Sequence, residues 1–340
     1  MTVSIIIAVK TWQENLERCV KACQELDYSD FEIIILPDQK QFPTQSGNCF
    51  ASNRESGIKG VSLSIIPTGP VSPGRKRDIA LSYAKGEILA FIDDDAYPRK
   101  DWLKKAQENF SDPQVAAVGG PAITPSSDNL RQRASGIIFA SYLVSGPYRY
   151  RYVPAKRRQV DDYPTCNFLV RKSIMQQAGG FATNFWPGED TKLCLKITKK
   201  LNKKIIYDPE VVVYHHRRPL FLPHLKQVAN YALHRGYFAK IYPQTSLRIA
   251  YFIPTLFLLA IVGGGILSLF FLSFRTIYFS GLILYLLLVF IFSINKDLKL
   301  FSLVFLGIIL THLTYGLWFL KGLLSLSCKL YISSDADFVK

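Results

Sequence analysis

Three adjacent carboxylates, Asp93, Asp94 and Asp95, stand in the stretch FIDDDAYP, directly after an apolar run. Neighbouring like charges repel one another, so such a group is costly at the end of a packed strand unless a cation binds there. Hard divalent cations prefer carboxylate oxygens, and magnesium commonly bridges carboxylates to substrate phosphates. Acidic turns without a ligand are also common. The position after a buried strand favours a Mg²⁺ or Mn²⁺ site that holds a diphosphate.

A second polar group lies between residues 166 and 197. Gly179 and Gly180 can bring the backbone close to a ligand, or can simply end a helix. Glu189 and Asp190 follow Trp-Pro-Gly and open a helical pattern, which is also how an ordinary helix cap looks. As chemical groups, one of the two carboxylates can act as a general base that takes a proton from an acceptor hydroxyl.

Two histidines, His215 and His216, end the strand-like run KKIIYDPEVVVYHH. An imidazole nitrogen at this place can bind a metal ion. A structural or surface-exposed histidine pair is the alternative.

The elements that must position these residues alternate between strand and helix over residues 1–120. Helical periodicity is expected over 12–26, 75–85 and 101–110, and apolar strands over 3–9, 31–37, 61–67 and 87–93. This alternation predicts a mainly parallel sheet covered by helices, with ligands at the carboxyl ends of the strands. Asp38 follows the second strand, so it is expected on the same edge as Asp93–Asp95.

The last third of the chain is strongly apolar. Residues 249–274, 277–294 and 300–320 are each long enough to cross a bilayer. Buried core helices are the alternative. Lys296 and Lys299 in the linker 295–299 favour the cytosol, which places the catalytic half there and the tail outside, although Lys321 and Lys329 favour the opposite. Residues 322–332 are a candidate interfacial helix.

Net charge and cysteine usage restrict the class of protein. The 340-residue chain has a formal net charge of +15, and the basic, aromatic stretch 141–158 is typical of a membrane interface with anionic headgroups, with a solvated basic loop as the alternative. Nucleic acid is not expected as a partner, because no binding motif accompanies the charge. Six scattered cysteines without a CxxC pair indicate a reducing compartment. The N-terminus lacks the features of a signal peptide and is typical of a first strand.

The motifs together resemble the inverting family 2 glycosyltransferases of GT-A fold over residues 3–218. The resemblance rests on the order of VSIIIAVKTWQENLERCV, FEIIILPD, GRKRDIALSYAKGEILAFIDDDAYPRKDWL, NFLVRKS, GGFATNFWPGEDTKLCLKI and YDPEVVVYHH. It implies a Rossmann-like α/β domain, a nucleotide-diphosphate sugar as donor, with a UDP-sugar expected, and Mg²⁺ or Mn²⁺ as cofactor.

Site residues follow from the same resemblance. It implies that Asp95 and His215 bind the cation, with His216 as the runner-up, and that Asp190 is the catalytic base with Glu189 beside it. Asp78 occupies the place of the family's usual Asn in the helix over the nucleotide. The implied contacts to the nucleotide sugar are Ala8, Val9, Asp38, Arg77, Asp93, Asp94, Gly179 and Gly180.

The sequence departs from the family pattern in three places. The residues after the first strand are Ala-Val-Lys-Thr instead of Pro-Val-Tyr-Asn, and Asp38 stands in Pro-Asp-Gln-Lys instead of Asp-Asp-Gly-Ser. The QxxRW motif of processive synthases is missing, which favours enzymes that add one sugar to a lipid-linked acceptor. In its region, His234 and Arg235 can clamp a diphosphate, with a basic amphipathic helix on the membrane as the alternative.

We therefore expect a GT-A domain over 1–220, an amphipathic interface segment over 221–246, three transmembrane helices over 247–322 and a tail over 323–340. The expected protein is a multi-pass enzyme of the cell membrane with a cytoplasmic catalytic domain. It would move one sugar to a polyprenyl phosphate or diphosphate-sugar acceptor, with inversion, in envelope polysaccharide or glycoconjugate synthesis. Alternatives are a processive polysaccharide synthase or a non-catalytic nucleotide-sugar-binding membrane protein. Few polar residues within the spans argue against a transporter. A metal-dependent nucleotidyltransferase would not explain the glycine, Glu-Asp and histidine motifs.

Overall fold

The computed structural model describes residues 1–39, 61–183 and 185–326 of the chain. By its contacts the chain divides into two compact units. Unit 1 comprises residues Met1–Ile123 and Val153–His216, and unit 2 comprises Thr124–Tyr152 and Arg217–Lys340. The sequence placed a boundary at residue 220, whereas the contacts assign 124–152 to the unit that contains the apolar helices.

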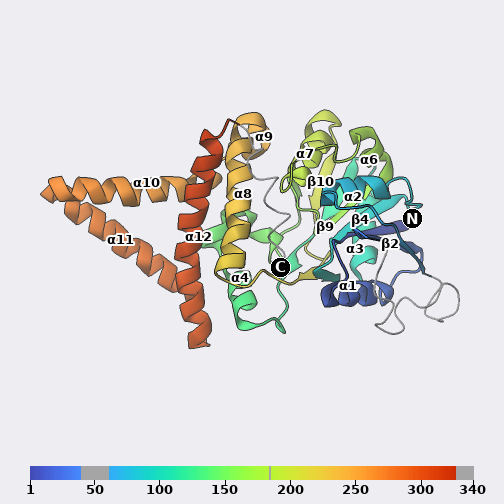
Figure 1. Ribbon diagram of the computed structural model, residues 1–340, viewed down its shortest axis with the longest axis horizontal. Helices are drawn as coiled ribbons and strands as arrows, with labels where there is room; N and C mark the ends of the chain where they lie inside the picture. Colours follow the sequence, from blue (N-terminus) through green and yellow to red (C-terminus); the bar gives the residue numbers. More distant parts are fainter. Residues whose placement is uncertain (40–60, 184, 327–340) are drawn as a thin grey trace. The chain divides into compact units, whose positions relative to one another are not determined.

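Unit 1 is an α/β domain, as the alternation of patterns predicts (Figure 1). Its helices are α1 (Glu14–Gln24), α2 (Pro73–Ala80), α3 (Trp102–Glu108), η1 (Asn109–Ser111), α6 (Lys172–Ala178), α7 (Glu189–Leu195) and η3 (Lys196–Lys200). Its strands are β1 (Val3–Ala8), β2 (Phe31–Leu36), β3 (Ser62–Ile65), β4 (Ile88–Asp93), β5 (Ala96–Pro98), β6 (Val115–Gly119), β7 (Ala122–Ile123), β8 (Arg158–Val160), β9 (Asn167–Arg171), β10 (Lys204–Tyr207) and β11 (Val213–His215).

The main sheet has the strand order β3-β2-β1-β4-β9-β6-β10-β8. Strands β1 to β4 are parallel to one another, and β9 lies antiparallel between β4 and β6. Strand β10 is parallel to β6, and β8 is antiparallel to β10. The predicted parallel order therefore holds for the first half of the sheet, and the second half is mixed. The run KKIIYDPEVVVYHH was expected as one strand, but a turn over residues 208–212 divides it into β10 of the main sheet and β11 of a small second sheet, β5-β11-β7. Strands β5 and β7 were not predicted, because they have only two or three residues.

The core of unit 1 follows from the alternation of strand side chains. Ile5 and Ile7 of β1 pack with Leu16 and Cys19 of α1 and with Trp102 of α3. On the opposite face, Phe91 of β4 makes an edge-to-face contact with Phe181 at 5.6 Å between ring centroids. Both faces of the sheet are covered, as expected for strands that are apolar throughout.

Unit 2 is helical. Its elements are α4 (Leu130–Ala140), α5 (Tyr142–Ser145), η2 (Gly146–Arg151), α8 (Leu222–Ile241), α9 (Pro243–Ser246), α10 (Ile249–Phe270), α11 (Leu272–Ser293) and α12 (Leu298–Leu324). Helices α10, α11 and α12 are long and apolar enough to cross a membrane, and their bounds agree with the three predicted spans. The candidate helix over 322–332 is described only to residue 326, where α12 has already ended at Leu324. The residues 327–340 of the predicted tail lie outside the described residues, as do Lys40, Cys49 and Cys328.

Helices α8 and α12 pack with their backbones in close approach (Figure 1). A Cβ on Gly236 of α8 would lie 2.1 Å from the carbonyl oxygen of Phe319, and one on Gly322 of α12 would lie 2.0 Å from that of Leu233. Small residues at helix interfaces are typical of membrane-embedded packing. The predicted interface segment 221–246 therefore consists of α8 and the short α9, and α8 packs closely against the candidate span α12.

Candidate functional site

The carboxyl ends of β1, β2 and β4 meet at one edge of the main sheet. In the strand register, Ala8 lies beside Leu36 on one side and Asp93 on the other. Val9 and Asp38 follow at the same edge, and the backbone N–H of Asp38 donates to the carbonyl oxygen of Lys10 at 3.1 Å. The residues predicted to contact the nucleotide from these three strands are therefore neighbours.

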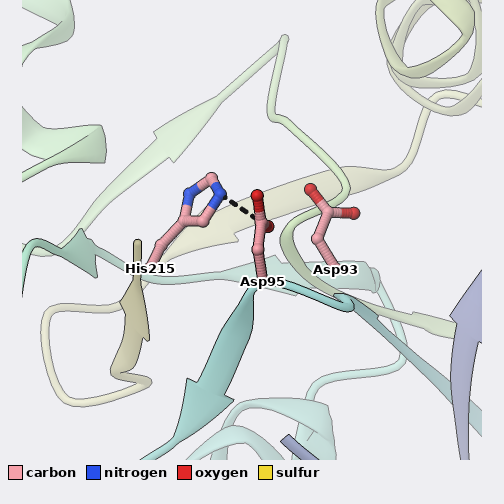
Figure 2. A group of neighbouring side chains, drawn as sticks. All are labelled: Asp93, Asp95 and His215. Carbon is pink, nitrogen blue, oxygen red and sulfur yellow. Dashed lines mark ion pairs between the residues drawn. The ribbon is translucent and has the colours of Figure 1, made fainter. Parts of the chain in front are cut away.

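Asp93, Asp95 and His215 form a cluster whose ligand atoms all lie within 4.8 Å of one another (Figure 2). The His215 Nε2 lies 3.0 Å from the Asp95 Oδ1, and both side chains are largely buried. Strand pairing produces this contact, because β11 runs antiparallel to β5 and places His215 opposite Ala96, the residue after Asp95. Two carboxylates and one imidazole within this range are a donor set that suits Mn²⁺ or Mg²⁺.

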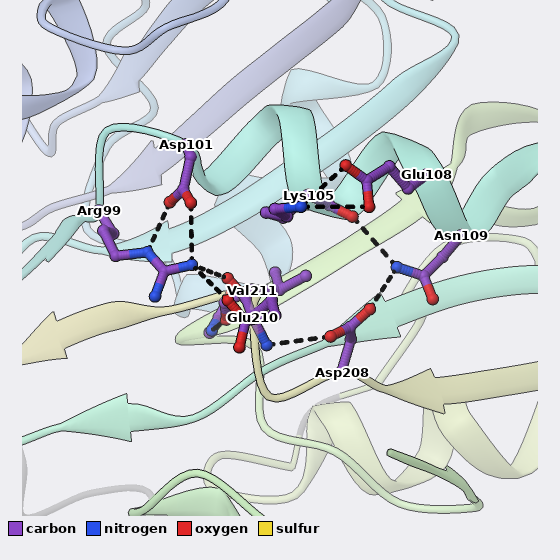
Figure 3. A network of polar contacts seen from close by, with 9 residues as sticks. Arg99, Asp101, Lys105, Glu108, Asn109, Asp208, Glu210 and Val211 are labelled. Carbon is purple, nitrogen blue, oxygen red and sulfur yellow. Dashed lines mark hydrogen bonds and ion pairs between the residues drawn. The ribbon is translucent and has the colours of Figure 1, made fainter. Parts of the chain in front are cut away.

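A polar network holds the turn that leads into β11 (Figure 3). The Arg99 guanidinium donates to both carboxylate oxygens of Asp101, at 2.5 and 2.9 Å, and to the Glu210 carbonyl oxygen at 2.8 Å. The Asn109 side chain donates to Asp208 at 2.8 Å, and Asp208 accepts from the Glu210 N–H at 2.9 Å. Residues 208–212 are thereby tied to β5 and α3, which fixes where His215 lies.

Asp94 is turned toward α1, because its Oδ2 accepts a hydrogen bond from the Gln13 side chain at the N-cap position. It is not part of the cluster of possible metal ligands. The structure therefore separates the three adjacent carboxylates: Asp93 and Asp95 lie in the cluster, and Asp94 orients the start of a helix.

Arg77 of α2 is an ion pair partner of two carboxylates. Its guanidinium lies 2.9 Å from Asp93 and 3.0 Å from Glu189, and the arginine side chain is 4% exposed. Burial raises the pKa of the Glu189 carboxyl above its ordinary value, and the neighbouring Arg77 acts in the opposite direction. The side chain of Glu189 is 7% exposed, so this carboxylate is an internal partner of Arg77 and has little access to an acceptor.

Asp190 is the more accessible of the two adjacent acids. It lies in the first turn of α7 and is partly exposed, and its Oδ1 accepts a hydrogen bond from the Thr191 N–H at 2.7 Å. Helix α7 is anchored from its other side, because Thr191 donates to a carboxylate oxygen of Asp162 at 3.0 Å. Of the predicted catalytic pair, Asp190 is therefore the residue whose side chain is partly accessible.

The glycine pair ends α6. Gly179 and Gly180 have φ values of +67° and +65°, in the left-handed region that favours glycine. A Cβ on Gly180 would lie 2.3 Å from Asp78, whose two carboxylate oxygens accept hydrogen bonds from the N–H groups of Phe181 and Ala182 at 2.8 and 3.2 Å. Asp78 thus shapes the glycine turn from the adjacent helix.

Sequence reasoning missed Lys76, which precedes Arg77 in α2. The Lys76 ammonium donates to the carbonyl oxygens of Val9, at 2.5 Å, and Leu36, at 3.2 Å, and to Asp38. A lysine one residue before the arginine of the motif was a signal for this role. Helix α2 therefore carries three consecutive residues that fix three different parts of the site.

His234 and Arg235 lie in α8 of unit 2. His234 is 6% exposed, and its Nδ1 lies 2.9 Å from the carbonyl oxygen of Asn230 in the same helix. The Arg235 guanidinium stacks on the ring of Tyr251 at 4.8 Å and donates to Ser246 at 3.1 Å. The arginine is partly exposed and contacts Tyr251 of α10, whereas the histidine is buried.

The comparisons with known proteins agree with this arrangement. Residues 4–179 match the family described as glycosyl transferase family 2, and the chain belongs to that family. The pre-mycofactocin glycosyltransferase of Mycobacterium tuberculosis is 24% identical over 216 residues, which cover 64% of this chain and 43% of that protein. The GalNAc(5)-diNAcBac-PP-undecaprenol beta-1,3-glucosyltransferase of Campylobacter jejuni is 26% identical over 137 residues, which cover 39% of this chain and 42% of that protein. The chain thus spans less than half the length of these two relatives.

The fold is shared with a solved structure. The mannosyltransferase PcManGT from Pyrobaculum calidifontis, in complex with GDP-Man and Mn²⁺, superposes with a TM-score of 0.63 at 17% identity. The match covers 93% of this chain and 87% of that one. The predicted GT-A domain followed by three candidate membrane-spanning helices is confirmed.

Proposed function

We propose that the protein transfers a single sugar from a nucleotide-diphosphate sugar to a lipid-linked acceptor, with inversion at the anomeric carbon. The observation that carries the proposal is the convergence of Asp93, Asp95 and His215 at the ligand edge of a family 2 domain, in a chain that also has three apolar helices of membrane-spanning length. The Campylobacter relative is named for an undecaprenol-linked acceptor, which supports a lipid-linked substrate here.

The donor would be held by unit 1. Asp95 and His215, with Asp93 beside them, would hold Mg²⁺ or Mn²⁺, and a bound cation supplies positive charge opposite the diphosphate leaving group. Arg77 keeps the Asp93 carboxylate in place from the buried side. Asp38 would accept a hydrogen bond from the base or ribose, and the backbone at the end of β1, at Ala8 and Val9, would line the same edge.

The acceptor would be activated by Asp190. Its carboxylate accepts the proton of an incoming hydroxyl while that oxygen attacks the anomeric carbon opposite the diphosphate, so one displacement inverts the configuration. Glu189 is not suited to this step because it is buried and paired with Arg77. An acceptor with a phosphate oxygen is already anionic and needs no base, and Asp190 would then orient it.

Unit 2 would hold the enzyme at the membrane, where a lipid-linked acceptor is found. Helices α10, α11 and α12 anchor the chain, and Lys296 and Lys299 favour a cytosolic position for the linker between the last two. In that orientation the catalytic unit would lie in the cytoplasm. Arg235, stacked on Tyr251 of α10, would lie at the level of the lipid headgroups, where a basic side chain is attracted to anionic lipid. A role in the synthesis of an envelope polysaccharide or glycoconjugate follows from such an acceptor.

The proposal is tested with membranes that contain the full chain. They are incubated with labelled UDP- and GDP-sugars, and the label in the organic-extractable lipid fraction is counted. We expect one donor to label lipid. Asp190→Asn should abolish labelling if the acceptor is a hydroxyl and preserve it if the acceptor is a phosphate, and the exposed Asp112→Asn is the matched control. Transfer of sugar only to soluble or polymeric products would overturn the lipid acceptor.

A further inference from the structure

Lys76 is a buried cation whose three hydrogen-bond acceptors all lie at or just after the carboxyl ends of β1 and β2. Its side chain is 4% exposed, and its ammonium donates to Val9 after β1, to Leu36 at the end of β2 and to the Oδ1 of Asp38. A lysine ammonium has three N–H donors, so these three acceptors use all of them. Lys76 therefore has no donor left for a ligand, and it acts on the site only through the groups that it holds.

The Asp38 residue is fixed at its backbone as well as at its side chain. Its N–H donates to Lys10 at 3.1 Å, and its carbonyl oxygen accepts from the Gly69 N–H at 3.1 Å. The side chain is 13% exposed, so part of the carboxylate remains accessible. Within the described parts of the chain, Oδ1 is taken by Lys76, and Oδ2 accepts no hydrogen bond.

We infer that Lys76 is a positioning residue that sets the base preference of Asp38. With Lys76 in place, Asp38 favours a base that presents a single N–H donor to it. The protein would therefore prefer uridine diphosphate sugars over guanosine diphosphate sugars. The inference rests on the proposed function, because it assumes a nucleotide-sugar donor at this edge. Its basis is the number of oxygens that Asp38 can offer.

Uracil and guanine present different sets of hydrogen-bond donors to a carboxylate. Uracil presents one imide N–H between two carbonyl oxygens. If both oxygens of a carboxylate faced this N–H, the second one would be repelled by a neighbouring carbonyl oxygen, which also carries partial negative charge. Guanine presents an N–H next to an amino group, which together are best met by both oxygens of one carboxylate. Lys76 binds Oδ1 together with the carbonyl oxygens at the ends of β1 and β2, so Oδ2 is the oxygen that Asp38 presents to a base. This arrangement matches uracil and leaves one donor of guanine without a partner.

The test measures binding of UDP and GDP to the full chain in lipid nanodiscs, by calorimetry at saturating Mn²⁺. Wild type should bind UDP about tenfold more tightly than GDP, which is the effect of one unmet hydrogen bond to a charged group. Lys76→Met should weaken UDP binding about tenfold and bring the ratio of the two dissociation constants close to one. In an Asp38→Asn background, the same lysine substitution should leave the ratio unchanged.

Lys172→Met is the matched control, since it removes a lysine that donates to a backbone carbonyl, that of Ala84 at 2.6 Å, elsewhere in unit 1. It should leave the UDP-to-GDP ratio at the wild-type value. A wild-type protein that binds GDP as tightly as UDP would overturn the inference even if lipid labelling occurs. So would a Lys76→Met variant that loses affinity for both nucleotides by the same factor, because that is the result of a merely structural role. Failure to bind either nucleotide would overturn the proposed function together with the inference.

Discussion

Replacing Arg77 by Met should destabilise unit 1 severely, because the change leaves two carboxylates facing each other without their shared cation. Arg77 bridges Asp93 and Glu189 at 2.9 and 3.0 Å, and the side chains of the arginine and of Glu189 are 4% and 7% exposed. Breaking a buried ion pair by removing one partner typically costs about 3–5 kcal/mol. For a unit of this size that corresponds to a fall in melting temperature of roughly 6–20 °C.

The pH dependence of this loss has a definite sign. Burial already raises the pKa of Glu189 above its ordinary value of 4.5, and Arg77 opposes that rise. Without Arg77, the pKa of the folded state rises further above that of the unfolded chain. A carboxyl with a raised folded pKa contributes its stability below the unfolded pKa and loses it as the pH rises through the folded value. The loss of folding stability in the Arg77→Met variant, relative to wild type, should therefore be smaller near pH 5 than at pH 7.5.

Thiol exposure on heating is the assay, because Cys19, Cys23, Cys166 and Cys194 are buried and all belong to unit 1. A maleimide dye then reports unfolding of this unit in a background where Cys49 and Cys328 are replaced by Ser. Lys204→Met is the control, since its surface pair with Asp112 contributes at most about 1 kcal/mol. Adding Glu189→Gln to Arg77→Met should recover much of the loss. The reasoning is refuted if Arg77→Met has the same melting temperature as the control, or if adding Glu189→Gln does not raise the melting temperature of Arg77→Met.

Three further outcomes are expected. Gly180→Ala should lower the melting temperature of unit 1 by more than Gly179→Ala. Both substitutions cause backbone strain of about 1 kcal/mol, but only Gly180→Ala also places a Cβ 2.3 Å from Asp78. Equal melting temperatures would show that this contact does not matter. His215→Ala should weaken Mn²⁺ binding about tenfold or more, as measured by electron paramagnetic resonance of free Mn²⁺, whereas His216→Ala should not; the reverse result would reassign the ligand. Gly236→Leu should prevent α8 from packing on α12 and reduce the yield of monodisperse protein in detergent, and an unchanged elution profile would contradict the close approach seen at Phe319.

The fold was largely predictable where the sequence pattern is long and regular. The apolar run at 3–9 and its three counterparts gave the parallel half of the sheet, since buried parallel strands are apolar on both faces. Strands β5 and β7 could not be predicted, because two or three residues contain no usable alternation, and the turn that separates β10 from β11 inside one predicted strand was missed. The association of residues 124–152 with unit 2 is a tertiary property that no local pattern encodes.

The site was predictable in composition but not in pairing. The family motifs assigned Asp95 and His215 to the cation and Asp93 to the nucleotide, whereas in the structure the ligand atoms of all three lie within 4.8 Å of one another. The sequence did not reveal that Asp94 turns to Gln13, or that Glu189 pairs with Arg77, because both depend on which side chain a distant helix presents. Glu189 and Asp190 differ in burial, whereas Asp93, Asp94 and Asp95 are all partly buried and differ only in their partners. A pattern of charges contains neither kind of information.

Lipid labelling as a function of Mn²⁺ concentration, in wild type and Asp95→Ala, tests the central claim most directly. Membranes with the full chain are given the donor that labels lipid, and Asp112→Ala serves as the control for loss of an exposed carboxylate. We predict labelling that rises and saturates with Mn²⁺ in wild type and in the control, and labelling reduced at least a hundredfold in Asp95→Ala, as is usual when a charged group at the reacting centre is removed. Labelling that is independent of Mn²⁺, or that persists in Asp95→Ala, would contradict the account.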